Sequence, residues 1–120
     1  MKIAISTQGP ALSDAMDPRF GRAKFFVVVD SETGVGEAFN NSVNLNAAQG
    51  AGIQSAARVV ELGAAAVITG HMGPKAFAAL QAGGVAVYTG ASGTAAEALE
   101  QFKASKLSKA DGADVEGHWM

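Results

Sequence analysis

The chain has 120 residues, the usual size of one domain around one hydrophobic core, so we expect a single compact domain. Nine lysine and arginine residues stand against eleven aspartate and glutamate residues, and the net charge of −2 excludes an extended basic surface for binding nucleic acid through its phosphates. Cysteine is absent, which excludes disulfides, thiol nucleophiles and thiolate-bound zinc or iron–sulfur clusters, so any metal must use histidine, carboxylate or methionine ligands or arrive with ligands of its own.

The N-terminal part of the chain predicts three strands. Residues 2–6 and 25–30 are rich in branched and aromatic side chains and are bounded by turn formers, which is typical of buried strands. A turn at 30–34 separates the second run from a weaker strand at about 36–41, which would pair back on it as a hairpin. The first apolar run is too short for a signal peptide, and no segment reaches the ~20 apolar residues of a membrane span, so a cytoplasmic protein without membrane contact is expected.

Helices and strands alternate in the rest of the chain. The helices have recognisable end signals, which are Gly63 and Gly83 as C-terminal caps, Pro74 as a first helical residue, and the capping box of Thr94 with Glu97. The helices are predicted from 49 or 50 to the Gly63 cap, over 75–82, and from 95 to about 104. The two intervening strands are predicted over 65–69 and 85–89.

The predicted order is therefore β-β-β-α-β-α-β-α. Strands joined by helical crossovers lie parallel, while the early hairpin forms an antiparallel edge. These rules predict an α/β fold, a three-layer α/β/α sandwich with a five-stranded mixed sheet. The domain is expected over residues 1–104, followed by a polar C-terminal tail over 105–120.

Glycine-rich segments lie where a ligand of such a sheet would bind. In open α/β sheets, ligands collect at the carboxyl ends of the parallel strands, next to helix N-termini. The segments at these places are 7–10, 49–53, 70–74 and 90–93, and their backbone N–H groups would form a shallow anion cradle. A glycine beside a helix often serves only a turn or close packing, which is the alternative explanation for each segment. The candidate binding residues among them are Gly50, Ala51, Gly52, Ile53, Gly70, His71, Met72, Gly73 and Pro74.

Two arginines surround a Phe-Gly pair just ahead of the second predicted strand. Arg19, Phe20, Gly21 and Arg22 would place an exposed aromatic ring between two guanidinium groups. This combination suits a soft, bulky anion better than a compact, hydrated phosphate. The alternative is an exposed pair of arginines that only solvates the turn.

Other kinds of site have weaker signals. His71 and Met72 could ligate a metal, although adjacent side chains in an extended loop usually point apart. The first strand has no carboxylate, which a ribonuclease H-type two-metal nuclease would need. No nucleophile has a plausible base beside it, so a non-enzymatic binding protein is favoured over an enzyme.

The segments DPRFGRAKFFVVVD (17–30), GAGIQSA (50–56) and VITGHMGPKAFAALQAGGVAVYTG (67–90) together carry a resemblance. They resemble the dinitrogenase iron-molybdenum cofactor biosynthesis family, which includes NifX-type carriers, and the resemblance spans residues 1 to about 102. The opening MKIAISTQGP and the closing EGHW are most similar to the orange-protein branch of that family. The resemblance implies a ribonuclease H-like fold without nuclease activity and a noncovalently held molybdenum–copper sulfide cluster, whose sulfides already satisfy each metal.

The sequence also departs from part of that family. Some nitrogenase cofactor carriers have His-Phe-Gly where this chain has Arg19-Phe20-Gly21, and that histidine is implicated in cofactor binding there. An arginine cannot replace it as a metal ligand because the guanidinium group stays protonated, so electrostatic capture of an anionic cluster is favoured.

Three hypotheses stay open at this point. The first is binding or assembly of the molybdenum–copper sulfide cluster, or carriage of an iron-molybdenum cofactor precursor. The second is a regulatory interaction module linked to cell-division or ATPase complexes, a link that the orange-protein resemblance implies. The third is a hydrolase or nuclease.

Overall fold

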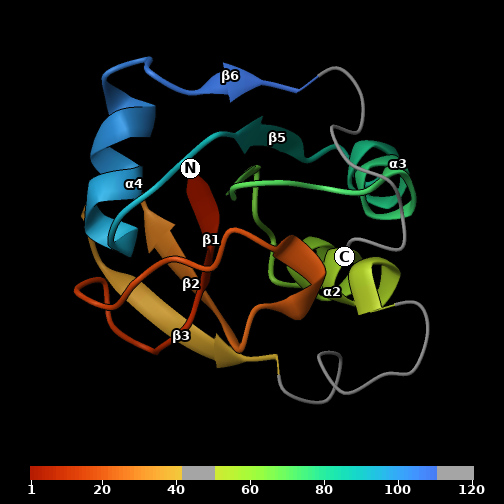
Figure 1. The fold of residues 1–120 in the computed structure, drawn as a ribbon, viewed down its shortest axis with the longest axis horizontal. Helices are drawn as coiled ribbons and strands as arrows, with labels where there is room; N and C mark the ends of the chain where they lie inside the picture. The colour runs from red at the N-terminus through yellow and green to blue at the C-terminus, as the bar shows by residue number, and fades with distance from the viewer. Residues whose placement is uncertain (42–50, 111–120) are drawn as a thin grey trace.

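The computed structural model describes residues 1–41 and 51–110 (Figure 1). Its strands are β1 (Lys2–Thr7), β2 (Phe25–Asp30), β3 (Gly36–Asn40), β4 (Ala66–Ile68), β5 (Ala86–Thr89) and β6 (Ser108–Lys109). Its helices are α2 (Ala51–Glu61), α3 (Pro74–Ala82) and α4 (Ala95–Lys103), and a short 3₁₀ turn, η1, covers Phe20–Arg22. None of the described helices is long and apolar enough to cross a membrane.

The strands form one mixed sheet in the order β3-β2-β1-β4-β5-β6. β1, β4 and β5 are parallel, whereas β2 pairs antiparallel with both β1 and β3. The predicted antiparallel hairpin at one side of a parallel centre is therefore confirmed. β1, β4 and β5 all end at the same edge of the sheet, which we call the carboxyl edge.

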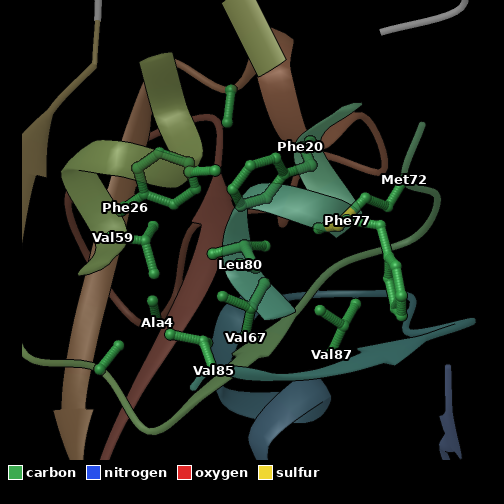
Figure 2. Close-up of a cluster of buried hydrophobic side chains, with 14 of the residues drawn as sticks. Ala4, Phe20, Phe26, Val59, Val67, Met72, Phe77, Leu80, Val85 and Val87 are labelled. Atoms are coloured by element: carbon green, nitrogen blue, oxygen red, sulfur yellow. The ribbon is translucent and has the colours of Figure 1, made fainter. Parts of the chain in front are cut away.

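Helices cover both faces of this sheet (Figure 1). Alternate residues of β1 divide the core, because Ala4 faces the cluster that contains residues of α2 and α3, while Ile3 and Ile5 face the cluster that contains residues of α4. Figure 2 shows the cluster on the α2 and α3 side, where Leu80 and Val59 point toward the strand residues. The three layers follow from this alternation, since every central strand buries both of its faces.

The prediction of five strands is wrong, because the sheet formed by the described residues has six. The additional strand, β6, pairs antiparallel with β5 through Thr89 with Ser108 and Tyr88 with Lys109, within the segment predicted to be a tail. β6 has only two residues, both exposed, and such a strand lacks the apolar alternation by which strands are found in a sequence. The ribonuclease H-like classification stays a prediction.

The predicted helix ends are confirmed where the structure describes them. Gly63 has a φ of +78° after α2, the left-handed conformation expected of a C-terminal cap. At the start of α4, the Thr94 side chain accepts a hydrogen bond from the Glu97 N–H at 3.1 Å, and the Glu97 carboxylate accepts one from the Thr94 N–H at 2.9 Å. The predicted start of the first helix at 49 or 50 lies outside the described residues.

The capping box makes a stability prediction. Thr94→Ala leaves the Glu97 N–H without its acceptor, so we expect the free energy of unfolding to fall by about 1 kcal/mol in urea denaturation. Ser92→Ala, at an exposed position two residues earlier, is the matched control and should change it by less than about 0.5 kcal/mol. Equal effects of the two substitutions would contradict a stabilising role of the cap.

Candidate anion-binding site

Four segments meet at the carboxyl edge. The long loop after β1 leads into η1, the loop of residues 69–73 leads from β4 into α3, and the loop of residues 90–93 leads from β5 into α4. α2 runs antiparallel to β4, so its N-terminus also lies at this edge, and η1 packs against α2. The glycine segments predicted as a cradle are therefore brought to one edge of the sheet. The two faces differ in whether the chain itself caps the helix that begins there.

The helix end on the α4 face is closed by the protein itself. The N–H groups of Ala95 and Ala96 donate to the carbonyl groups of Asp14 at 2.9 Å and Leu12 at 2.8 Å. The third donor, the N–H of Glu97, is taken by the capping threonine. Because these first-turn donors are occupied, the N–H groups of Ala95, Ala96 and Glu97 are not available to an anion at the start of α4. That segments 7–10 and 90–93 contribute to an anion cradle stays a prediction.

The glycines in segment 90–93 are explained by the backbone conformation that they adopt. Gly90 and Gly93 both have a φ of +87°, a left-handed conformation that favours glycine. The carbonyl group of Gly93 accepts a hydrogen bond from the Met16 N–H at 3.0 Å, which fastens this segment to the loop after β1. The alternative that a glycine beside a helix serves only a turn therefore accounts for Gly90 and Gly93. The candidate anion site lies on the other face of the sheet.

The helix end on that other face has no side-chain cap. α3 begins after Gly73, which supplies no capping side chain, and its first residue is Pro74, which has no N–H. Helical geometry leaves the N–H groups of Lys75 and Ala76 without intrahelical acceptors, and the helix dipole adds partial positive charge. Lys75 is exposed and contributes an ammonium group in the same turn. An anion would be stabilised at this end of α3.

The segment of residues 17–24, which we call the arginine turn, is joined to the loop before α3. Arg19 forms an isolated parallel bridge with His71, and the His71 N–H donates to the Pro18 carbonyl group at 2.7 Å. Gly70 allows this approach, because a Cβ atom there would lie 2.7 Å from the Pro18 Cα. The structure thus brings together two groups of predicted site residues that are far apart in the sequence.

A buried hydrogen-bond network fixes the base of the turn. The Ser6 hydroxyl donates to the Asp17 carbonyl group at 2.7 Å, and its oxygen lies 2.8 Å from the Thr69 hydroxyl, which has the one remaining proton that can join them. The Asp17 N–H donates in turn to the Ser6 carbonyl group at 2.8 Å. Sequence reasoning missed these residues, although small hydroxyl residues at the ends of two predicted buried strands were the available signal.

The local charge is opposite in sign to that of the whole chain. Residues 17–24 contain the three basic residues Arg19, Arg22 and Lys24 and the acidic residue Asp17, a net charge of +2 in a chain with a net charge of −2. The Arg19 side chain is 51% exposed and pairs through Nε with the Asp17 carboxylate at 3.5 Å. An anion near this turn would therefore meet a local positive potential.

The expectation that Phe20 is exposed is wrong. Its side chain is 0% exposed, and its ring centroid lies 5.2 Å from that of Phe26 in the core (Figure 2). The 3₁₀ turn directs Phe20 inward while the preceding Arg19 stays at the surface, a local geometry that residue spacing does not reveal. Phe20 therefore anchors the arginine turn to the core, and its neighbour Gly21 is also buried.

The two candidate metal ligands differ in burial. Met72 is 1% exposed and belongs to the same core cluster as Phe20, whereas His71 is partly exposed. Among the residues that the structure describes, no group of three or more histidine and carboxylate side chains is placed to hold a metal ion. Ligation by His71 and Met72 stays a prediction.

The fourth candidate segment is described in part. Gly50 lies outside the described residues, Ala51 is the first residue of α2, Gly52 is partly exposed and Ile53 is 41% exposed. The start of α2 is tied to the arginine turn by Asn41, whose side-chain amide donates to the carbonyl group of Ala23 at 2.8 Å and to the hydroxyl of Ser55 at 3.1 Å.

The buried network makes a second stability prediction. Ser6→Ala removes a hydroxyl that contacts two polar groups, so the free energy of unfolding should fall by roughly 1–3 kcal/mol. Thr69→Val should cost less in the Ser6→Ala background than in the wild type, because the Thr69 hydroxyl has then already lost its partner. Urea denaturation of the four proteins measures this difference, and strictly additive effects would contradict the network.

Known proteins share this architecture. The chain is 32% identical over 113 residues to the uncharacterized protein MJ0580 of Methanocaldococcus jannaschii, covering 91% of each chain. The apo form of the orange protein from Desulfovibrio gigas has a TM-score of 0.92 and 40% identity, over 95% of this chain and 96% of that one. A putative NifB protein from Thermotoga has a TM-score of 0.83 and 33% identity, over 97% and 98% of the two chains. The family model described as dinitrogenase iron-molybdenum cofactor matches residues 1–105, and this chain belongs to that family.

Proposed function

We propose that this chain is a non-enzymatic binding protein that holds or helps to assemble a preformed anionic metal–sulfur cluster, and that the cluster is a molybdenum–copper sulfide. The observation that carries the proposal is the position of the basic turn of residues 17–24 against the uncapped N-terminus of α3. Both features stabilise negative charge, and they meet on one face of the carboxyl edge.

The donor set fits a cluster that brings its own ligands. The sequence has no cysteine, so the metal–sulfur bonds of a bound cluster would be those to its own sulfide ions. The residues at the site offer N–H groups instead, from the guanidinium groups of Arg19 and Arg22 and from the backbone at the start of α3, and these would donate to sulfide from outside the metal coordination sphere. The protein would therefore capture the cluster intact.

The comparisons support a cofactor-binding role. The family is described by the dinitrogenase iron-molybdenum cofactor, and the relative with 40% identity is an orange protein whose structure is that of an apo form. Arg19 supports outer-sphere capture, because its guanidinium group cannot ligate a metal. The alternative cargo is an iron-molybdenum cofactor precursor. A cell-division or ATPase partner and a cytoplasmic location stay predictions.

Loading with tetrathiomolybdate and a copper(I) salt tests this function. After desalting, the wild-type protein should retain molybdenum and copper together in a fixed ratio, with a charge-transfer band in the visible spectrum. Arg19→Ala with Arg22→Ala should weaken retention about tenfold or more, because two charged donors are lost. Lys103→Ala with Lys106→Ala removes the same charge at the opposite end of α4 and should leave retention unchanged.

Each result of the loading experiment has a distinct meaning. A wild-type protein that emerges colourless and free of metal would make the proposed function wrong. Retention by the double arginine variant equal to that of the wild type would exclude the arginines from binding. Unchanged retention of molybdenum when copper is omitted would contradict a molybdenum–copper sulfide as the cargo.

A further inference from the structure

Asp17 is a buried carboxylate directly beneath the proposed cluster site. Its side chain is only 4% exposed, although it lies in a loop at the edge of the sheet. Its N–H and carbonyl groups are both bonded to Ser6 of β1, and Ser6 contacts Thr69 at the end of β4. The position of Asp17 is therefore set by the two central strands.

Asp17 in turn contacts both the backbone and the side chain of Arg19. Its Oδ1 atom accepts a hydrogen bond from the Arg19 backbone N–H at 2.9 Å and lies 3.5 Å from the Arg19 Nε. One carboxylate oxygen thus contacts both the main chain and the side chain of the same arginine. The ion pair runs through Nε, which is a donor other than the two terminal amino groups that can make a bidentate contact with an anion.

We propose that Asp17 is a positioning residue that holds Arg19 ready for the anion, an inference that rests on the proposed function. An arginine side chain has many rotamers, and ordering it at the moment of binding would weaken affinity. The carboxylate orders it during folding instead. Its negative charge also offsets part of the positive potential of the turn, so a carboxylate beside an anion site is explained by its effect on the position of Arg19 and not by its charge.

Substitutions at Asp17 separate these two effects. Asp17→Ala removes the acceptor, and the dissociation constant for tetrathiomolybdate with copper(I) should rise about tenfold, as is typical when an outer partner of a binding group is lost. Asp17→Asn keeps an oxygen that can accept the Arg19 N–H, and binding should stay within about threefold of the wild type or become tighter. Asp14→Ala is the matched control, because the Asp14 carboxylate also accepts a nearby backbone N–H, from Ala11 at 2.8 Å, on the closed side of the edge.

A double-mutant cycle distinguishes positioning from a merely structural role. In the Arg19→Ala background, Asp17→Ala should cause less than about a twofold further loss of affinity, because there is no longer a side chain to position. An equal loss in both backgrounds would overturn the proposal. An unchanged affinity of Asp17→Ala in the wild-type background, or an Asp17→Asn protein as weak as Asp17→Ala, would also overturn it.

One measurement needs neither a ligand nor a variant of Asp17. The order parameter of the Arg19 Nε–H bond in the apo protein, measured by ¹⁵N relaxation and assigned with Arg19→Ala, should exceed about 0.6 if the side chain is held. A lower value would overturn the positioning role, even where Asp17→Ala fails to fold. If the wild-type protein retains no cluster, the proposed function fails, whereas this order parameter still decides the position of Arg19.

Discussion

The hydrogen bonds among Ser6, Asp17 and Thr69 are the constraint on which the carboxyl edge depends. The chain leaves β1 and must cross this edge before it returns as β2, and the polar groups that it buries on the way need partners. Two groups of Ser6, its carbonyl and its hydroxyl, make three hydrogen bonds from within the sheet, two with Asp17 and one with Thr69. The crossing loop is consequently bonded to the same strands that build the core.

The helices α3 and α4, which begin on the two faces of the carboxyl edge, follow similar glycine-containing segments, but of these two only α4 is capped by side chains. On the α4 face, a capping box and two loop carbonyl groups take the free donors of the helix, so the polar groups there are used for stability. On the α3 face, glycine and proline begin the helix and no side chain caps it. The arginine turn lies on this second face, bridged through His71. Glycine content alone does not distinguish the two faces, because the difference depends on partners supplied from elsewhere in the chain.

Local signals in the sequence were sufficient for most of the fold. Buried strands, helix caps and the parallel or antiparallel sense of pairing among the five predicted strands depend on residue patterns within short windows, and these are predicted correctly. β6 was missed because a two-residue strand of polar side chains pairs only through its backbone. The arginines on either side of Phe20 predict an exposed ring, whereas its environment is set by Phe26 and by a 3₁₀ turn. The role of Asp17 depends on partners in two strands, which no local pattern contains.

The same network constrains the order of events during folding. Ser6 and Thr69 are 63 positions apart in the chain, so the base of the arginine turn cannot be complete until β1 and β4 have paired. An emerging chain that ends before β4 would therefore contain both arginines and no assembled site. A ligand that binds only the finished fold shifts the folding equilibrium by mass action, so cargo and folded state would stabilise each other only after synthesis has passed β4. A chain that has not yet reached β4 would therefore not offer the assembled site to such a ligand.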